Sequence, residues 1–498
     1  MKKIVLYLLC CVLSESVAQD SGFTQSYEME VVGASFHNLM LQGDTVVLAG
    51  TAKVDSLDQW GLLFAQFDTL GNLLNHRVYA DTSGDHYVFE RNYGIIASSD
   101  GGYVMTGNLF YKNWGFMAKL DRNGELEFLR EYPEVDIRNY AFKNVIELSD
   151  GYLIAGTKQV SNYTRKVFLL KTDLAGHQLW EKKYGELNED LALVSASVED
   201  ENTFYINASK SSYPFQSQFI EGEDWMQGEL IAVDSLGEEK WIWKNEVNKE
   251  AFYNDSQPTA DGGLLYGTGE FVIQNPWTWA YDLKVVKRDS AFNEEWSRSM
   301  TTNLAMGNFL HDLKIDADGN IIALGTWQGE GANFQATCLY KLSPNGDSIW
   351  TRCDTMYDPS YIYDYGEIGG IVILPSGSII GAGKVNRYDP QPTRSLGWLY
   401  KVTRDGCLED LCASPVVSTR IPNIPKVELY PNPVQDNLQI IFPEEFDLYL
   451  YDALGREHRR VLGQRDQSSM YLGNLKSGIY FLELRTGFTK QVRKIIVE

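Results

Sequence analysis

The feature that most constrains this chain is a short turn signal that recurs along its length. Each copy is an apolar, β-rich run that follows a turn such as Asp-Gly or Gly-Gly and ends in a small residue. Such turns supply the positive φ angles that a tight hairpin needs. The seven copies end at residues that lie 49 to 60 positions apart: Gly50, Gly107, Gly156, Asn207, Gly267, Gly325 and Gly383.

A second hairpin signal follows each of these anchors. An alternating strand leads into a turn that begins with Asp, Ser or Thr, and an aromatic residue often follows, as Trp180 follows Gly176. Each period therefore holds two hairpins and four strands, and it shows no helical periodicity. Four antiparallel strands per repeat predict an all-β chain folded as a β-propeller. We predict seven blades, with six or eight as the alternatives.

The aromatic residues after the turns are open to two interpretations. Trp180, Trp241 and Trp350 match half of the docking turn of quinoprotein propellers, but the Asp spacing differs by one residue. Asp173 and Gly176 likewise miss the spacing of sialidase-type Asp boxes. We therefore interpret the aromatic residues as wedges between neighbouring blades.

Composition limits the partners of this chain. The 498 residues are 44% hydrophobic, which is ample for a large core, and the net charge is −23. A surface this acidic repels nucleic acid and anionic membranes. No apolar run is long enough to span a membrane.

The N-terminus has the pattern of a secretory signal peptide over residues 1–18. Lys2 and Lys3 precede an apolar segment, and Ser16-Val17-Ala18 resembles a cleavage site. We expect the mature chain to begin with a strand over Phe23–Val31. This strand would complete the last blade by pairing with residues 398–403, because the seventh repeat lacks its own fourth strand.

Four cysteines lie outside the signal peptide, and an even number in an exported protein indicates disulfides. Cys338 and Cys353 flank a predicted hairpin turn, so they can face each other across two antiparallel strands. Cys407 and Cys412 would close a tight loop. We predict these two pairs.

The segment 426–498 differs from the rest because it carries ten basic and ten acidic residues. It resembles the type A C-terminal sorting domain of the Bacteroidetes type IX secretion system. The resemblance rests on Leu429–Val434, Tyr451–Arg456, Leu475–Tyr480 and the ending Lys494–Val497. The motif residues singled out are Tyr430, Pro431, Asn432, Pro433, Gly455, Gly478 and Tyr480.

This resemblance implies an Ig-like sandwich, export through the periplasm, and contact with the secretion machinery and its sorting protease. It further implies release or anchoring at the cell surface. The predicted domains are a signal peptide over 1–18, a propeller over 19–413, a linker over 414–425 and the sorting domain over 426–498.

No catalytic or cofactor motif stands out. The six histidines lack paired metal-ligand spacing, and no nucleophile elbow or phosphate loop occurs. Asp316–Asn320 resembles half of a calcium loop, but it lacks the bidentate Glu and lies where each repeat has a turn. We assign no catalytic, cofactor or metal residues.

The connections between the second and third strands vary and are rich in aromatic residues, as is the link into the seventh repeat. In a propeller these segments share one face, which would suit sugar stacking or a protein interface. A non-enzymatic binding protein is the leading hypothesis. A glycan-active enzyme with a carboxylate pair on that face is the alternative, and packing of the aromatics within their own loops is the structural interpretation. These segments carry Phe110 and Tyr111 among other aromatic residues. The candidates singled out are Trp60, Trp114, Trp225, Trp277, Trp279, Trp327, Tyr361, Tyr363 and Asp364.

Overall fold

The computed structural model shows only strands and turns among the residues that it describes. These are 22–27, 33–54, 59–81, 83–89, 94–134, 140–161, 164–186, 189–200, 202–211, 226–245, 252–275, 278–300, 309–328, 335–354, 363–388, 394–408, 428–452, 456–485 and 490–497. Within these ranges, no helix has the length and apolar character needed to cross a membrane. The predicted signal peptide and linker lie outside them.

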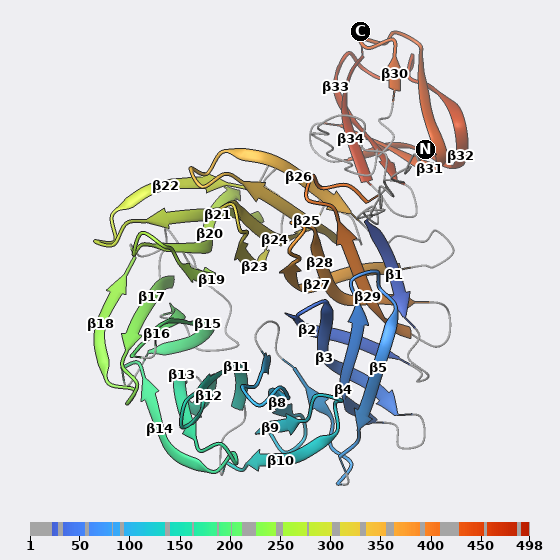
Figure 1. Cartoon of the computed structure of the whole chain (residues 1–498). Coiled ribbons are helices and arrows are strands. Elements are labelled where there is room, and N and C mark those ends of the chain that lie inside the picture. Colours follow the sequence, from blue (N-terminus) through green and yellow to red (C-terminus); the bar gives the residue numbers. More distant parts are fainter. Residues whose placement is uncertain are drawn as a thin grey trace, which may run out of the picture.

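Seven antiparallel sheets stand around a ring, so the fold is a seven-bladed β-propeller (Figure 1). Blade 1 holds β2 (Ala34–Gln42), β3 (Thr45–Val54), β4 (Gln59–Asp68) and β5 (Leu73–Tyr79). Blade 2 holds β6 (Tyr87–Val88), β7 (Ile95–Ala97), β8 (Tyr103–Leu109), β9 (Trp114–Leu120) and β10 (Leu126–Tyr132). Blade 3 holds β11 (Tyr140–Leu148), β12 (Gly151–Ser161), β13 (Thr164–Thr172) and β14 (Gln178–Tyr184).

The remaining blades follow the same order from the inner to the outer strand. Blade 4 holds β15 (Asp190–Asp200), β16 (Thr203–Ser211), β17 (Met226–Val233) and β18 (Glu239–Lys244). Blade 5 holds β19 (Phe252–Pro258), β20 (Leu264–Asn275), β21 (Thr278–Arg288) and β22 (Glu294–Ser299). Blade 6 holds β23 (Phe309–Ile315), β24 (Ile321–Gln328), β25 (Gln335–Leu342) and β26 (Ser348–Asp354). Blade 7 holds β27 (Tyr363–Ile373), β28 (Ile379–Tyr388), β29 (Arg394–Val402) and β1 (Phe23–Tyr27).

The seventh blade is closed by the N-terminal strand. Strand β1 pairs antiparallel with β29, so that Phe23 lies opposite Lys401 and Tyr27 opposite Gly397. The indole Nε1 of Trp398 donates a hydrogen bond of 2.9 Å to the Thr24 hydroxyl. The predicted closure is therefore confirmed over β1, and residues 28–31 lie outside the described ranges.

The core lies between the blades rather than in one central mass. One cluster joins Val47 and Phe64 of blade 1 to Tyr103 and Phe116 of blade 2, and all four are buried. Burial of one such aromatic side chain contributes about 1.5–3 kcal/mol. Each sheet is therefore stabilised by the next, and closure of the ring gives the last sheet a partner.

The turn between the third and fourth strands shows why the sequence repeats. In blade 3, Asp173 Oδ1 accepts hydrogen bonds from the backbone N–H groups of Ala175 and His177, at 2.9 and 2.8 Å. Gly176 has a φ of +78°. A Cβ atom there would lie only 2.9 Å from Phe128 of blade 2, so the position requires glycine.

The outer strand of each blade holds the turn of the next blade. The Tyr132 hydroxyl of blade 2 donates to the carbonyl of Gly176 in blade 3, at 2.7 Å. Together with Phe128, this contact confirms the interpretation of the aromatics as wedges. Equivalent bonds to turn carbonyls join Tyr27 to Gly71, Tyr79 to Gly124, Tyr184 to Gly237, Arg298 to Gly346 and Arg352 to Gly406.

The junction between blades 4 and 5 is built differently. Phe292 takes the place of the turn glycine and has a φ of +64°. Its ring lies 4.8 Å from Trp241 in an edge-to-face arrangement and also stacks on Trp243. Arg288 lies over Trp243, 4.5 Å from the ring centroid. An aromatic cluster thus takes the place of the tyrosine contact.

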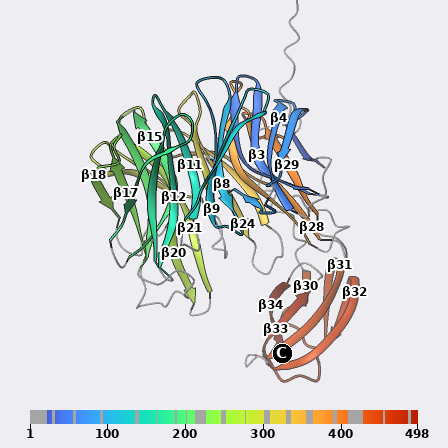
Figure 2. The same ribbon diagram turned by 90° about the horizontal axis from the view of Figure 1, so that it is seen from below.

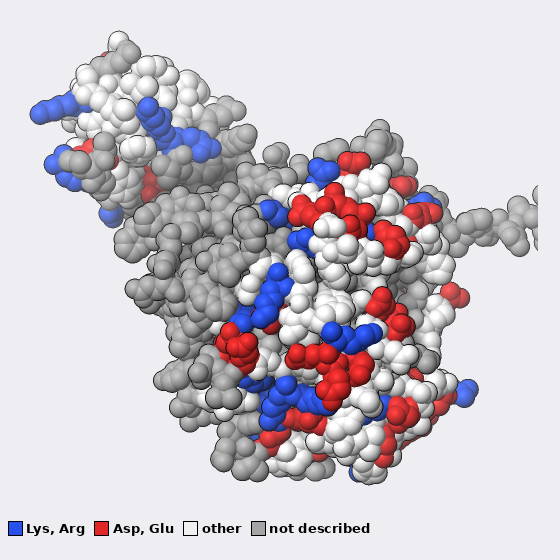
Figure 3. Space-filling model, turned by 90° about the vertical axis from the view of Figure 1, so that its left-hand side faces the viewer, with Lys and Arg blue, Asp and Glu red and all other residues white. Residues whose placement is uncertain are grey.

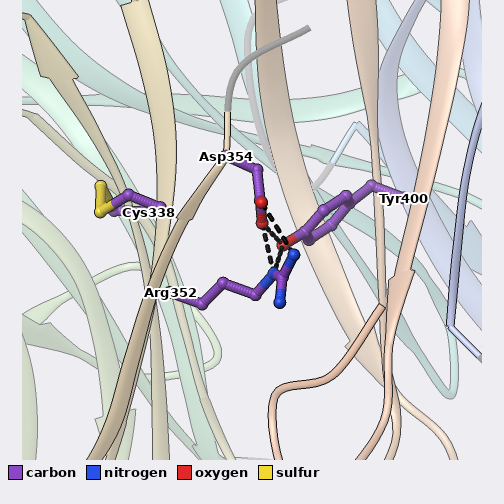
Figure 4. Close-up of a disulfide and its surroundings, with 5 residues drawn as sticks. Cys338, Arg352, Asp354 and Tyr400 are labelled. Carbon is purple, nitrogen blue, oxygen red and sulfur yellow. Dashed lines mark hydrogen bonds and ion pairs between the residues drawn. A yellow bond between two sulfur atoms is a disulfide. The ribbon is translucent and has the colours of Figure 1, made fainter. Parts of the chain in front are cut away.

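Blade 6 contains the predicted disulfide between Cys338 and Cys353, which lie opposite each other on β25 and β26. Nearby, Arg352 forms a bidentate ion pair with Asp354, at 2.5 and 2.8 Å (Figure 4). Tyr400 of blade 7 donates to the same carboxylate. Cys407 is also disulfide-bonded, but position 412 lies outside the described residues, so that pairing stays a prediction.

The outer strands of blades 3 to 5 carry charges of both signs, as Figure 3 shows. Lys182 pairs with Glu238 of the next blade, and Arg298 pairs with Asp347 at 3.3 Å. The acidic excess therefore does not form a single-sign surface on this side.

The C-terminal region is a separate β-sandwich with its own core. It contains β30 (Glu428–Tyr430), β31 (Asn437–Asp452), β32 (Glu457–Tyr471), β33 (Gly478–Arg485) and β34 (Lys490–Val497). The sequence predicts two strands over Leu438–Ile440 and Leu448–Asp452. These are one strand, β31, because its pairing with β32 crosses residues 442–445 through a bulge.

Candidate ligand face

The order of strands separates the two ends of the propeller. Turns between the first and second strands and between the third and fourth strands lie at one end, here called the turn end. Connections between the second and third strands, and from each blade to the next, lie at the opposite end, here called the loop end. The strands run between these two ends (Figure 2).

The structure places the described candidates at the loop end. Trp60, Trp114 and Trp279 are the first or second residues of third strands, and Trp327 is the second-last residue of a second strand. Tyr363 and Asp364 open the inner strand β27. Trp225, Trp277 and Tyr361 lie outside the described residues.

One expectation about these residues is wrong. The sequence places them in connections, whereas the six described ones belong to strands. The hairpins are longer than predicted because their aromatic and polar residues continue the pairing. In blade 5, for example, Trp279 lies opposite Ile273 on β20.

Two exposed aromatic rings mark the loop end of blade 2. Phe110 and Tyr111 lie in the connection between β8 and β9, and their exposed fractions are 58% and 65%. Their ring centroids are 5.2 Å apart in an edge-to-face arrangement. The imidazole of His86 lies 5.0 Å from the Tyr111 ring. We call Phe110, Tyr111 and His86 the aromatic platform.

A buried carboxylate fixes the backbone of this platform. Asp85 accepts a hydrogen bond of 2.7 Å from the Tyr111 N–H on one oxygen and of 2.9 Å from the Lys112 N–H on the other. The Phe110 N–H donates to the carbonyl of His86 at 3.0 Å. The connection is therefore held in one conformation although its two rings face solvent.

His86 joins the platform to blade 1. Its Nδ1 atom accepts a hydrogen bond of 3.1 Å from the backbone N–H of Trp60. Because Nδ1 accepts here, the neutral ring carries its proton on Nε2. The candidate Trp60 is thus tied through its backbone to the exposed rings.

A second buried carboxylate supports the loop that carries Asp85. Asp81 accepts hydrogen bonds from Ser83 and from the backbone N–H of Asp85, at 3.0 Å for the latter. Burial raises the pKa of Asp81, but these bonds and the charge of Lys112 outweigh it and hold the pKa below its usual value. Lys112 in turn binds Glu131 at 2.9 Å and lies over Trp114.

This arrangement suits binding by contact rather than proton transfer. Both oxygens of Asp85 are occupied by backbone donors, so this buried carboxylate is committed to holding the loop. Across the described ranges, His, Cys, Asp and Glu side chains form no group of three that could hold a metal ion. Asp316, the first residue of the calcium-like segment, accepts from the N–H groups of Asp318 and Asn320 as a turn residue does.

Sequence reasoning named Trp60 and Trp114 as candidates, counted Phe110 and Tyr111 only among the aromatic residues of the connections, and missed Asp85 and His86. The spacing of these two residues carries no motif, because their partners are backbone groups of distant loops.

Comparisons with known proteins agree with the division of the chain. Residues 428–498 match the family described as secretion system C-terminal sorting domain. The chain therefore carries a type IX sorting domain, as the motifs predict, and this domain indicates export to the cell surface or medium. A search of curated protein sequences gives no significant match.

Several solved structures resemble the chain at low identity. Drosophila plexin A in complex with semaphorin 1b is 9% identical with a TM-score of 0.40, over 77% of this chain and 87% of that one. The β-propeller domain of the trilobed protease from Pyrococcus furiosus is 10% identical with a TM-score of 0.41, over 77% and 99%. The acylaminoacyl peptidase of Pyrococcus horikoshii is 9% identical with a TM-score of 0.41, over 82% and 58%.

Proposed function

We propose that this protein is an exported, non-enzymatic binding protein whose propeller contacts a glycan or another protein through its loop end. Export follows from the sorting domain. Cleavage of residues 1–18, removal of the sorting domain by a sorting protease, and release or surface anchoring in a Bacteroidetes host belong to the proposal. Nucleic acid is not a partner in this proposal.

The aromatic platform is the observation that supports it. Large aromatic rings are normally buried, yet Phe110 and Tyr111 are more than half exposed on a backbone fixed by Asp85. Aromatics that merely packed their own loop would be covered. A ring held rigidly in solvent can stack on a sugar or enter a protein interface at little cost in conformational entropy.

The test compares the full-length protein with the double variant Phe110→Ala/Tyr111→Ala on a printed glycan array and on a panel of purified extracellular proteins. We expect the variant to lose tenfold or more in affinity, since an exposed aromatic anchor contributes about 1–3 kcal/mol. The matched control is Leu74→Ala/Leu179→Ala, which removes two exposed apolar side chains from outer strands. Unchanged binding by the platform variant would refute the site.

A glycosidase panel run in parallel distinguishes the binding protein from the alternative, a glycan-active enzyme. Hydrolysis without stable binding would replace this proposal with a glycan-active enzyme that uses a carboxylate pair at the loop end. Stable binding without hydrolysis supports the proposal.

A further inference from the structure

We propose that the aromatic platform binds an arginine side chain of a basic protein partner rather than a neutral sugar. The inference rests on the function proposed above, because it names the ligand class of the same site. Two features of the platform support it: the arrangement of its three rings, and the charges of the groups that hold them in place.

The rings of Phe110, Tyr111 and His86 do not form one flat surface. The planes of Phe110 and Tyr111 lie at 78° to each other. The His86 ring is tilted by 44° from Tyr111 and by 43° from Phe110. Because a sugar ring stacks flat on one aromatic face, only one of these rings could hold it in that way. The platform therefore offers a sugar ring little more than a single aromatic side chain would.

The spacing of the rings suits a compact cation. The ring centroids are 5.2 Å apart between Phe110 and Tyr111, 5.0 Å between Tyr111 and His86, and 6.3 Å between His86 and Phe110. A cation is attracted to an aromatic ring when it lies within about 6 Å of the ring centroid. One guanidinium group on the exposed side of Phe110 and Tyr111 can therefore interact with both rings at once. Arginine fits better than lysine, since its planar guanidinium stacks on aromatic faces and is more weakly hydrated.

A buried carboxylate is bonded to both segments of the platform. Asp85 accepts a hydrogen bond of 2.7 Å from the N–H of His86, on the same oxygen that accepts from Tyr111. Its other oxygen accepts from the N–H of Lys112. These amide donors are neutral, so they do not balance the negative charge of Asp85. The rings are therefore held next to an anionic group.

Two further carboxylates adjoin the platform, and the lysines around it are fewer than the carboxylates. Lys112 binds Glu131 at 2.9 Å and lies 3.8 Å from Asp81. Lys53 lies near the end of β3 in blade 1. Together with Asp85, three carboxylates thus stand against two ammonium groups among the described residues around the platform.

The pKa of Tyr87, which follows His86 in the sequence, indicates the sign of the local field. Burial raises the pKa of Tyr87, and the charges of Asp81, Glu131 and Asp85 raise it further. The carboxylates therefore make the field at this residue negative, and a negative field attracts a cation.

The charge of the whole chain favours the same kind of partner. The net charge is −23, and residues 426–498 carry as many basic as acidic residues, so the acidic excess lies outside the sorting domain. A surface of this sign attracts a basic protein and repels a second copy of itself. A basic protein that presents an exposed arginine is therefore the occupant we infer.

The test compares two peptides for binding to the full-length protein by isothermal titration calorimetry. One is Gly-Gly-Arg-Gly-Gly with blocked termini, and the other has citrulline in place of arginine. Citrulline has nearly the same shape as arginine but no charge. We expect the arginine peptide to bind at least tenfold more tightly, and added salt to reduce this preference.

Two platform variants separate the aromatic faces from apolar bulk. Phe110→Leu/Tyr111→Leu keeps apolar side chains but removes the aromatic faces, whereas Phe110→Trp/Tyr111→Trp keeps the faces. We expect the leucine variant to lose the preference for the arginine peptide and the tryptophan variant to retain it.

A charge variant keeps the proposal testable if the leucine variant misfolds. Glu131→Gln removes one of the three carboxylates and should weaken binding of the arginine peptide severalfold. The matched control is Glu125→Gln, which removes an exposed carboxylate at the turn end of the same blade and should leave the affinity unchanged.

Equal binding of the two peptides by the native protein would overturn the proposal, as would an arginine preference that survives in the leucine variant. Array binding that requires Phe110 and Tyr111, without an arginine preference, would assign the platform to a glycan and leave the proposed function in place. Platform-dependent binding to phosphatidylcholine vesicles, again without that preference, would assign it to a lipid head group. If neither array nor panel binding depends on the platform, the proposed function itself is wrong.

Discussion

The two ends of the propeller differ in how far the blades repeat. At the turn end, the same contact recurs at six of the seven blade junctions: a side chain from one outer strand binds the carbonyl of the next turn. At the loop end the connections share neither length nor sequence, and blade 2 exposes two aromatic rings. Repetition thus marks the residues that assemble the ring, and divergence marks the end that we propose for binding.

The clasp formed by β1 carries the largest expected effect. Deleting residues 19–32 from the otherwise full-length chain removes Phe23 and Tyr27 from the junction with blade 1 and uncovers β29. We expect the free energy of unfolding to fall by about 3–5 kcal/mol, with aggregation through the exposed strand edge. Denaturant unfolding measures this loss, and Gln25→Ala, an exposed position on β1, is the control. Equal stability of the deleted chain would show that the clasp does not close the ring.

The ion pair between Arg352 and Asp354 of blade 6, which also binds Tyr400 and Gly406 of blade 7, should come next. Asp354→Asn leaves the largely buried Arg352 guanidinium without a counter-charge, so we expect a loss of about 2 kcal/mol, reduced from a fully buried pair by partial solvent screening. Asp318→Asn breaks the exposed pair with Arg404 and should cost less than about 0.5 kcal/mol. If Asp354→Asn and Asp318→Asn lose similar amounts of unfolding free energy, the buried ion pair does not stabilise the fold more than the exposed one.

A single turn-end contact should have a smaller effect. Tyr132→Phe removes the hydroxyl that binds the Gly176 carbonyl and keeps the ring, so the expected loss is about 1 kcal/mol. Tyr111→Phe removes an exposed hydroxyl at the loop end and should leave the unfolding free energy unchanged. Thermal and urea unfolding measure the unfolding free energy of both variants. If the contact does not stabilise the fold, Tyr132→Phe and Tyr111→Phe will be equally stable.

Acid should weaken the turn end slightly. Hydrogen bonds from the backbone or side chain of the following turn residues lower the pKa values of Asp121, Asp173 and Asp289. Since these values lie below those of the unfolded chain, the stabilisation is complete above about pH 4 and is lost as the pH falls through the folded values. Replacing all three with Asn keeps an oxygen acceptor, so the melting temperature should fall less between pH 5 and 2. An unchanged acid profile would contradict this account.

Most of the fold could be predicted from the sequence because each turn depends on local chemistry. The turn itself requires Asp173 and Gly176. The spacing of Phe23 and Tyr27 equals that of Phe128 and Tyr132, and this match predicts that the N-terminal strand closes the ring. The continuity of β31 could not be predicted, because it depends on a bulge in the pairing with β32.

The candidate site was less predictable for a physical reason. The sequence indicates that aromatic residues lie at the loop end. Whether each of these side chains is exposed depends on its packing against residues that are distant in the sequence, so exposure could not be predicted. Asp85 and His86 form hydrogen bonds with backbone groups of other connections, so no sequence motif identifies them. The strand positions of Trp279 and Trp327 likewise depend on how far each hairpin stays paired.

The central claim is that the turn end maintains the fold and the loop end binds. The most direct measurement uses one set of full-length variants and records two quantities for each. One is the free energy of unfolding. The other is the affinity for the glycan or protein that the native chain binds on the array or in the panel. Phe110→Ala and Tyr111→Ala should lose affinity and keep stability, whereas Tyr132→Phe and Asp354→Asn should lose stability and keep affinity. If both groups lose both properties in parallel, the separation of the two ends is wrong.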